Sequence, residues 1–179
     1  MDDQDDAGLV ARCLRGEADA FEPLVARYQR VLFNVALRMV DDYEDARDVT
    51  QSAFVKAYEK LDSYDPRYRF FSWIYRIMLN ESLNLMRARR PRAPLDRVPA
   101  SSADPQRDQE AREVGERVRS ALQELTREQR EVIVLRHFGE LTYEEMAVAL
   151  ALPEKTVKSR LFTARRRLAD VLLERRFSR

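Results

Sequence analysis

Aromatic rings and arginines alternate between residues 64 and 76, a combination suited to single-stranded nucleic acid. Six of the chain's sixteen aromatic residues lie in this short stretch. Unpaired bases stack on rings, at roughly 1–3 kcal/mol per base, and guanidinium groups neutralise the phosphates between them. The alternative is an ordinary core, which would leave the arginines beside an apolar patch. We expect the cluster as a whole to contact nucleic acid, although a single ring such as Trp73 could be buried. Its members are Tyr64, Arg67, Tyr68, Arg69, Phe70, Phe71, Trp73, Tyr75 and Arg76.

The charges fall into blocks, although the formal net charge is only +1. Residues 41–65 hold eight acidic and three basic side chains, whereas residues 67–92 hold seven arginines and a single acid, Glu81. Residues 153–179 hold nine basic and three acidic side chains. An acidic block beside two basic blocks indicates two kinds of partner, one of them nucleic acid.

Several function classes find no support in the sequence. Cys13 is the only cysteine and His137 the only histidine, so neither an intrachain disulfide nor a Cys/His metal site is expected. We find no carboxylate cluster, glycine-rich phosphate loop or metal-ligand spacing, and we expect neither an enzyme nor a bound cofactor. No apolar run is long enough to span a membrane, and the acidic N-terminus is unlike a signal peptide. The composition fits a cytoplasmic protein.

The spacing of apolar residues predicts an all-α protein with two small helical domains. Residues 1–92 form the first domain and residues 113–179 the second. Residues 93–112, in a stretch rich in proline and charge, are predicted to be a flexible linker that leaves the separation of the domains unset. Helices are expected over about 9–15, 19–40, 43–61 and 72–90, and later over 143–150 and 153–173.

The second domain contains the signals of a helix-turn-helix motif. Thr126 with Gln129, and Thr142 with Glu145, are capping-box patterns that begin helices, and Gly139 stands where a helix should end. In the last helix an apolar face of Val157, Leu161, Ala164 and Leu168 should pack inward. The remaining side chains suit the phosphates and base edges of duplex DNA. The predicted DNA contacts are Lys155, Thr156, Lys158, Ser159, Phe162, Thr163, Arg165 and Arg166.

Together these segments resemble the extracytoplasmic-function (ECF) sigma factors of bacterial RNA polymerase. Residues 45–54 are similar to the polymerase-binding helix of that family, and residues 71–80 to its promoter-melting segment. Residues 141–147 and 153–168 resemble its helix-turn-helix, which reads the −35 element. The resemblance extends over nearly the whole chain from Leu9 to Leu173, with the two blocks in the family's order.

The resemblance implies a role for each block. Asp45, Asp48, Gln51 and Phe54 would dock on the clamp helices of the largest polymerase subunit, which gives the acidic block a function. The first domain would capture and melt the −10 element. An anti-sigma protein is a further expected partner. The implied −10 contacts are Tyr64, Arg67, Tyr68, Arg69, Phe71, Trp73, Arg76, Asn80 and Arg87.

Two alternatives remain open at this point, and some residues depart from the family pattern. The chain could be a stand-alone helix-turn-helix regulator, although such a protein needs neither an acidic docking helix nor a base-stacking loop. An enzyme that acts on nucleic acid is the second alternative. Asn84 stands where the family commonly has aspartate, and Thr163 where arginine is frequent, so the promoter sequence is not specified.

Overall fold

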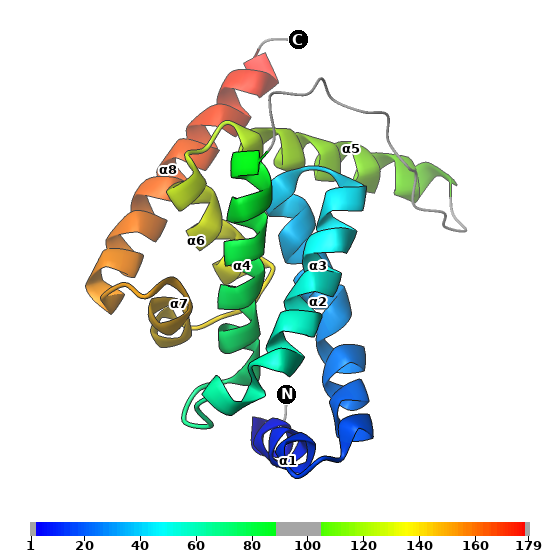
Figure 1. Cartoon of the computed structure of the whole chain (residues 1–179). Helices are drawn as coiled ribbons and strands as arrows, with labels where there is room; N and C mark the ends of the chain where they lie inside the picture. The colour runs from blue at the N-terminus through cyan, green and yellow to red at the C-terminus, as the bar shows by residue number, and fades with distance from the viewer. Residues whose placement is uncertain (1–2, 89–104, 178–179) are drawn as a thin grey trace.

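The computed structural model describes residues 3–88 and 105–177, and within these residues every regular element is a helix (Figure 1). The predicted all-α class is therefore confirmed. No helix of the described part combines the length and apolar character needed to cross a membrane. The helices are α1 (Asp3–Leu14), α2 (Glu22–Val40), α3 (Tyr43–Glu59), α4 (Phe70–Ala88), α5 (Pro105–Gln123), α6 (Arg127–His137), α7 (Tyr143–Leu150) and α8 (Glu154–Phe177), with 3-10 turns η1 (Ala18–Phe21) and η2 (Leu61–Ser63).

Side-chain caps fix where several helices begin. The Asp42 carboxylate accepts a hydrogen bond from the Asp45 amide at 3.0 Å and begins α3. Both predicted capping boxes are present, at Thr126 with Gln129 before α6 and at Thr142 with Glu145 before α7. Such caps satisfy amide groups that have no partner within the helix. They separate α6, α7 and α8 into short, closely spaced elements.

Helices α2, α3 and α4 form a bundle, with α1 across one end (Figure 1). Their apolar faces meet in an aromatic core, where the Tyr28 ring centroid lies 5.7 Å from that of Phe70 and 5.6 Å from that of Phe71. The buried Asp6 of α1 hydrogen-bonds to the Tyr28 hydroxyl and to Arg27. This pairing satisfies a carboxylate that would otherwise be costly to bury.

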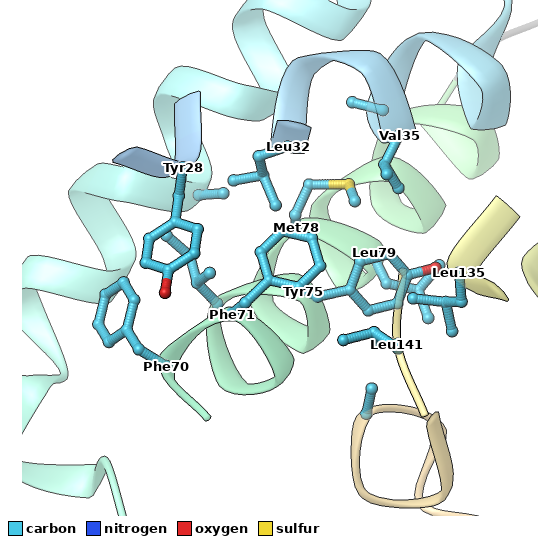
Figure 2. Close-up of a cluster of buried hydrophobic side chains, with 14 of the residues drawn as sticks. Tyr28, Leu32, Val35, Phe70, Phe71, Tyr75, Met78, Leu79, Leu135 and Leu141 are labelled. Atoms are coloured by element: carbon cyan, nitrogen blue, oxygen red, sulfur yellow. The ribbon is translucent and has the colours of Figure 1, made fainter. Parts of the chain in front are cut away.

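The bundle and the C-terminal helices are not separate bodies, because their buried side chains form one continuous cluster, here called the shared core. Tyr75 and Leu79 of α4 lie in it with Leu135 of α6 and Leu141 (Figure 2). Gly139 permits the close approach, since a β-carbon there would lie 2.9 Å from the Leu135 carbonyl oxygen and 3.3 Å from Phe71 Cε1. The sequence predicted that a flexible linker would leave the distance between the two halves variable, but in this structure packing in the shared core fixes it.

Arginines of the second half also hold the C-terminal end of α2. Arg130 donates to the Met39 carbonyl at 3.1 Å, and Arg119 donates to the Asp41 carbonyl at 2.8 Å and pairs with its carboxylate. The guanidinium of Arg38 lies 3.7 Å from the centre of the Phe138 ring. The last carbonyls of a helix lack intrahelical partners and carry a partial negative charge, so cations are favoured there.

The predicted linker corresponds only in part to a connection between helices. Its last eight residues, 105–112, belong to α5, which begins at Pro105. Proline suits the first turn of a helix because its missing amide proton is not needed there. Residues 93–104 of the predicted linker lie outside the described residues.

A shared core predicts that a change in one half destabilises both. Leu135 is fully buried, so Leu135→Ala should lower the free energy of unfolding by about 2–5 kcal/mol. We expect one transition whether unfolding is followed by far-UV circular dichroism or by the fluorescence of Trp73, the only tryptophan. Leu173→Ala makes the same chemical change at a half-exposed position and should cost about 0.5 kcal/mol or less. Separate transitions for the two halves would contradict the shared core.

Candidate functional site

The outward face of α8 carries the predicted DNA contacts. Val157, Leu161 and Ala164 are buried, as expected, and Leu168 is half-buried. Phe162 is 64% exposed, and the Arg166 guanidinium lies 6.0 Å from the centre of its ring. The side chains that the structure leaves exposed on this helix include all eight predicted contacts: Lys155, Thr156, Lys158, Ser159, Phe162, Thr163, Arg165 and Arg166.

The structure adds neighbours that the sequence did not assign to this face. A groove of about 560 Å³ runs between the start of α6, at Thr126 and Gln129, and the side chains of Lys155, Ser159 and Arg160. The signal that could have found it is the capping box of α6, since a capped helix start beside a recognition helix is a position for a DNA phosphate. The second half therefore presents a hollow polar surface as well as a helix.

The aromatic cluster divides between core and surface. Phe70, Phe71 and Tyr75 are buried, so the prediction that Phe71 contacts DNA is wrong for this structure. Their burial follows from the position of α4, which packs against α2 and α3 on one side and against α7 on another. Trp73 is half-buried and Tyr68 is 43% exposed. Both rings retain accessible surface.

The loop before α4 is held in shape by its own polar groups. The Tyr64 hydroxyl donates to the Tyr68 carbonyl at 2.8 Å, and the Tyr64 ring lies 5.5 Å from that of Trp73. Arg67 pairs with Asp65 at 2.6 Å, and these hydrogen bonds raise the pKa of the Arg67 guanidinium. Arg67 therefore reaches solvent with its charge already partly neutralised.

Further along, α4 presents an outward row of side chains, here called the α4 stripe: Trp73, Arg76, Asn80 and Arg87. Asn80, Arg76 and Arg87 are exposed, and their spacing of three, four and seven residues keeps them on one side of the helix. These are four of the predicted −10 contacts. The rings of Tyr64 and Tyr68 and the guanidinium of Arg69 adjoin the start of the stripe.

Helix α7 lies over the first part of this surface. Arg69 donates to the Glu145 carboxylate at 2.9 Å, and Arg76 donates to the Val148 carbonyl at 2.5 Å. A crevice of about 630 Å³ separates Tyr68 and Trp73 from α7. Burial raises the pKa of Glu145, but hydrogen bonds from the Thr142 amide and from Arg69 outweigh this effect and hold it below its usual value. The carboxylate is therefore charged where it meets Arg69.

The acidic helix α3 borders an apolar groove of about 490 Å³, here called the α2–α3 groove. Asp48 and Gln51 are exposed, as a docking role requires. Asp45 is buried in the first turn of α3, so the prediction that it faces a partner is wrong here. Phe54 is 8% exposed and lines the groove rather than projecting from it. The sequence missed the contribution of α2, whose Val25 and Phe33 line the other side.

Comparison with known proteins identifies the family. Residues 24–92 match Sigma-70 region 2, and residues 115–168 match Sigma-70, region 4. The RNA polymerase sigma-H factor of Pseudomonas aeruginosa is 34% identical over 182 residues, which cover 94% of each chain. The chain belongs to the ECF sigma factors. It is also 35% identical over 173 residues to the ECF RNA polymerase sigma-E factor of Escherichia coli strain K12, covering 89% of this chain and 90% of that protein.

A solved structure supports the same assignment. The structure of CnrH in complex with the cytosolic domain of CnrY matches with a TM-score of 0.75 and 34% identity, over 94% of this chain and 97% of that one. Region 2 of the sigma factor thus includes α2, α3 and α4, and region 4 includes α6, α7 and the first part of α8. The alternatives of a stand-alone regulator and a nucleic-acid enzyme are set aside by this membership.

His137 is a titratable side chain of the sigma factor that contacts α8. His137 Nε2 lies 3.4 Å from Arg165 Nη2. Partial burial lowers the pKa of His137 below 6.5, and the charges of Arg165 and Arg136 lower it further. Because the folded protein disfavours the charged imidazole, the unfolded chain binds more protons near neutrality. The resulting stability is present above about pH 6.5 and is lost as the pH falls.

We predict that Arg165→Gln raises the pKa of His137 toward 6.5, because it removes the nearest positive charge. The ring protons of this single histidine can be followed by NMR from pH 4.5 to 8. Arg167→Gln removes a charge from the same helix at an exposed position and serves as the control. A His137 pKa that is the same in wild type and in both variants would show that Arg165 does not act on the imidazole.

Proposed function

We propose that this sigma factor directs promoter-specific initiation through three surfaces. The α2–α3 groove and the exposed residues of α3 bind polymerase core, the α4 stripe captures and melts the −10 element, and α8 reads the −35 element. Residues 1–92 and 113–179 would be the units that carry these tasks. The protein would act in the cytoplasm, where the polymerase works.

The observation that carries this proposal is the division of α8 into two faces. Three apolar side chains point into the core, while the eight candidate contacts are exposed together. A recognition helix must offer such a face to the major groove, with arginine, hydroxyl and apolar groups for base edges. The groove beside α6 leaves room for the adjoining DNA backbone.

The polymerase contact is proposed to be the clamp helices of the largest subunit, seated in the α2–α3 groove. Val25, Phe33 and Val55 give the groove an apolar lining, and Gln51 and Arg30 supply polar groups at its edge. An amphipathic helix that lies in a groove buries apolar side chains while polar groups fix its register. Asp48 and Gln51 would supply such polar contacts, with Phe54 as part of the floor.

The −10 element would be held as a single strand along α4. Separating a duplex costs stacking and pairing, and a base that is flipped out recovers part of that cost when it stacks on a ring or enters a pocket. Trp73 and Tyr68 offer rings with accessible surface, and Asn80 offers both a donor and an acceptor to a base edge. Arg76 and Arg87 would neutralise phosphates along the strand.

An anti-sigma protein is proposed as the regulator. CnrH, which resembles this chain over nearly its full length, was solved in complex with the cytosolic domain of a second protein, CnrY. A protein that covered the α2–α3 groove would compete directly with polymerase core.

Run-off transcription tests the proposal as a whole. Polymerase core alone should give no promoter-specific transcript, and polymerase core with this protein should initiate at a defined set of genomic promoters.

We predict that Asp48→Arg combined with Gln51→Ala weakens binding to polymerase core about tenfold or more, or about 1.4 kcal/mol, because both exposed groups leave the docking surface. Affinity for core can be measured by fluorescence anisotropy of labelled sigma factor. The control, Asp170→Arg, makes the same charge reversal on an exposed part of α8 and should bind normally. Wild-type affinity of the double variant would place the core contact elsewhere.

We predict distinct roles for three residues of α8. Ser159→Ala and Phe162→Ala should relax preference at individual −35 positions, each costing about 1–3 kcal/mol on the preferred sequence. Arg166→Ala should weaken all sequences more evenly, since a phosphate contact carries little sequence information. Holoenzyme binding to a set of single-base −35 variants measures both effects, and Leu173→Ala is the control outside the motif. Equal losses on specific and scrambled −35 DNA for all three would contradict the proposed orientation.

A further inference from the structure

Helix α7 meets Arg69 and the start of the α4 stripe through two oxygen atoms, one from a carboxylate and one from a backbone carbonyl. Arg69 and Arg76 are both candidate ligands of −10 DNA, and each donates instead to an oxygen of α7. Arg69 binds a charged carboxylate, that of Glu145. Both side chains of this pair are largely buried, with 21% of Arg69 and 17% of Glu145 exposed.

The second oxygen lies at the end of α7 where negative charge accumulates. Val148 is in the last turn of the helix, where carbonyl groups run out of intrahelical partners and the helix dipole is negative. Its carbonyl accepts from Arg76 and also from the Ala151 amide, which closes the helix. One short helix thus presents two electron-rich oxygens to two arginines.

We propose that α7 is an internal substitute for the −10 DNA backbone, occupying Arg69 and Arg76 until the two regions separate. This inference rests on the proposed function, because it assumes that these arginines bind the −10 strand. This covering of Arg69 and Arg76 by α7, here called the mask, is selective. The recognition face of α8 stays exposed in the same structure, so the closed protein can bind −35 duplex while α7 occupies the first part of its −10 surface.

Displacing α7 from α4 also disrupts other contacts between the two regions. The mask can therefore be removed only by a partner that offsets the loss of all these contacts. Moving α7 away from α4 also exposes the shared core and breaks the contacts of Arg119 and Arg130 with α2. A single DNA strand that replaces two polar contacts cannot supply that free energy. A partner with a large docking surface can, and polymerase core is the partner proposed above.

The variant that tests the mask is Glu145→Gln. A glutamine at this position retains the capping box, as Gln129 shows at the start of α6, where its side chain accepts from the Thr126 amide at 3.1 Å. The variant therefore keeps α7 intact and removes only the charge that faces Arg69. Glu144→Gln is the matched control, since it removes the same charge from the exposed adjacent position.

Three measurements on the free full-length protein follow. Affinity for a fluorescent single-stranded −10 oligonucleotide should rise about two- to fivefold in Glu145→Gln, because the variant removes the charge of the ion pair but keeps an oxygen that can accept from Arg69. It should not rise in Glu144→Gln. Affinity for −35 duplex should stay unchanged, which also verifies that the helix-turn-helix is folded. Acrylamide should quench Trp73 more strongly in Glu145→Gln, because this ring lines the crevice under α7.

The outcomes separate failure of the mask from failure of the proposed function. The mask would be overturned if −10 affinity and quenching were the same in wild type and in both variants. An equal rise in both variants would also overturn it. Holoenzyme with Arg76→Ala tests the premise that Arg76 binds the −10 strand. Unimpaired initiation at a −10-dependent promoter would show that Arg76 does not bind DNA, and it would overturn the mask as well. Holoenzyme with Glu145→Gln should initiate like wild type, because core has already displaced α7.

Discussion

The burial of α4 on two sides determines how much of this protein can face DNA. One side of the helix packs against α2 and α3, and another packs against the C-terminal helices, so Phe71, Ile74, Tyr75 and Met78 are removed from water. Burial of such large side chains is the main source of stability for a chain of this size. What remains for recognition is a narrow outward row, and even its first part adjoins α7. Stability and DNA binding therefore compete for the same helix.

Local signals in the sequence predicted local structure well. The bounds of α7 and both capping boxes came from short-range chemistry, in which a side chain bonds to an amide three residues away. The two faces of α8 followed from helical periodicity, because this helix is buried on one side only. The aromatic cluster was harder to interpret. Period alone cannot show that Phe71 and Tyr75 are enclosed by a second group of helices whose residues lie far along the chain.

Contacts between the two regions explain most of what could not be predicted. Arg69 and Glu145 are 76 residues apart, and Arg130 and Met39 are 91 residues apart. Nothing in the spacing of either segment indicates its partner. A block of arginines in the sequence indicated a surface for nucleic acid, yet several of these cations already bind carboxylates or carbonyls within the chain. Counting basic residues therefore overestimates the positive charge that the closed protein displays.

The hydroxyl of Tyr75 sets a limit on how permanent the closed form is. It lies in the shared core and points toward α6 (Figure 2), and among the described residues no group hydrogen-bonds to it. Burying a hydroxyl without a partner costs on the order of 1–3 kcal/mol, which water would return once the seam opened. A fully apolar interface between the two halves would recover no such free energy when the halves separate. The unpaired Tyr75 hydroxyl therefore lowers the free energy needed to separate the two halves.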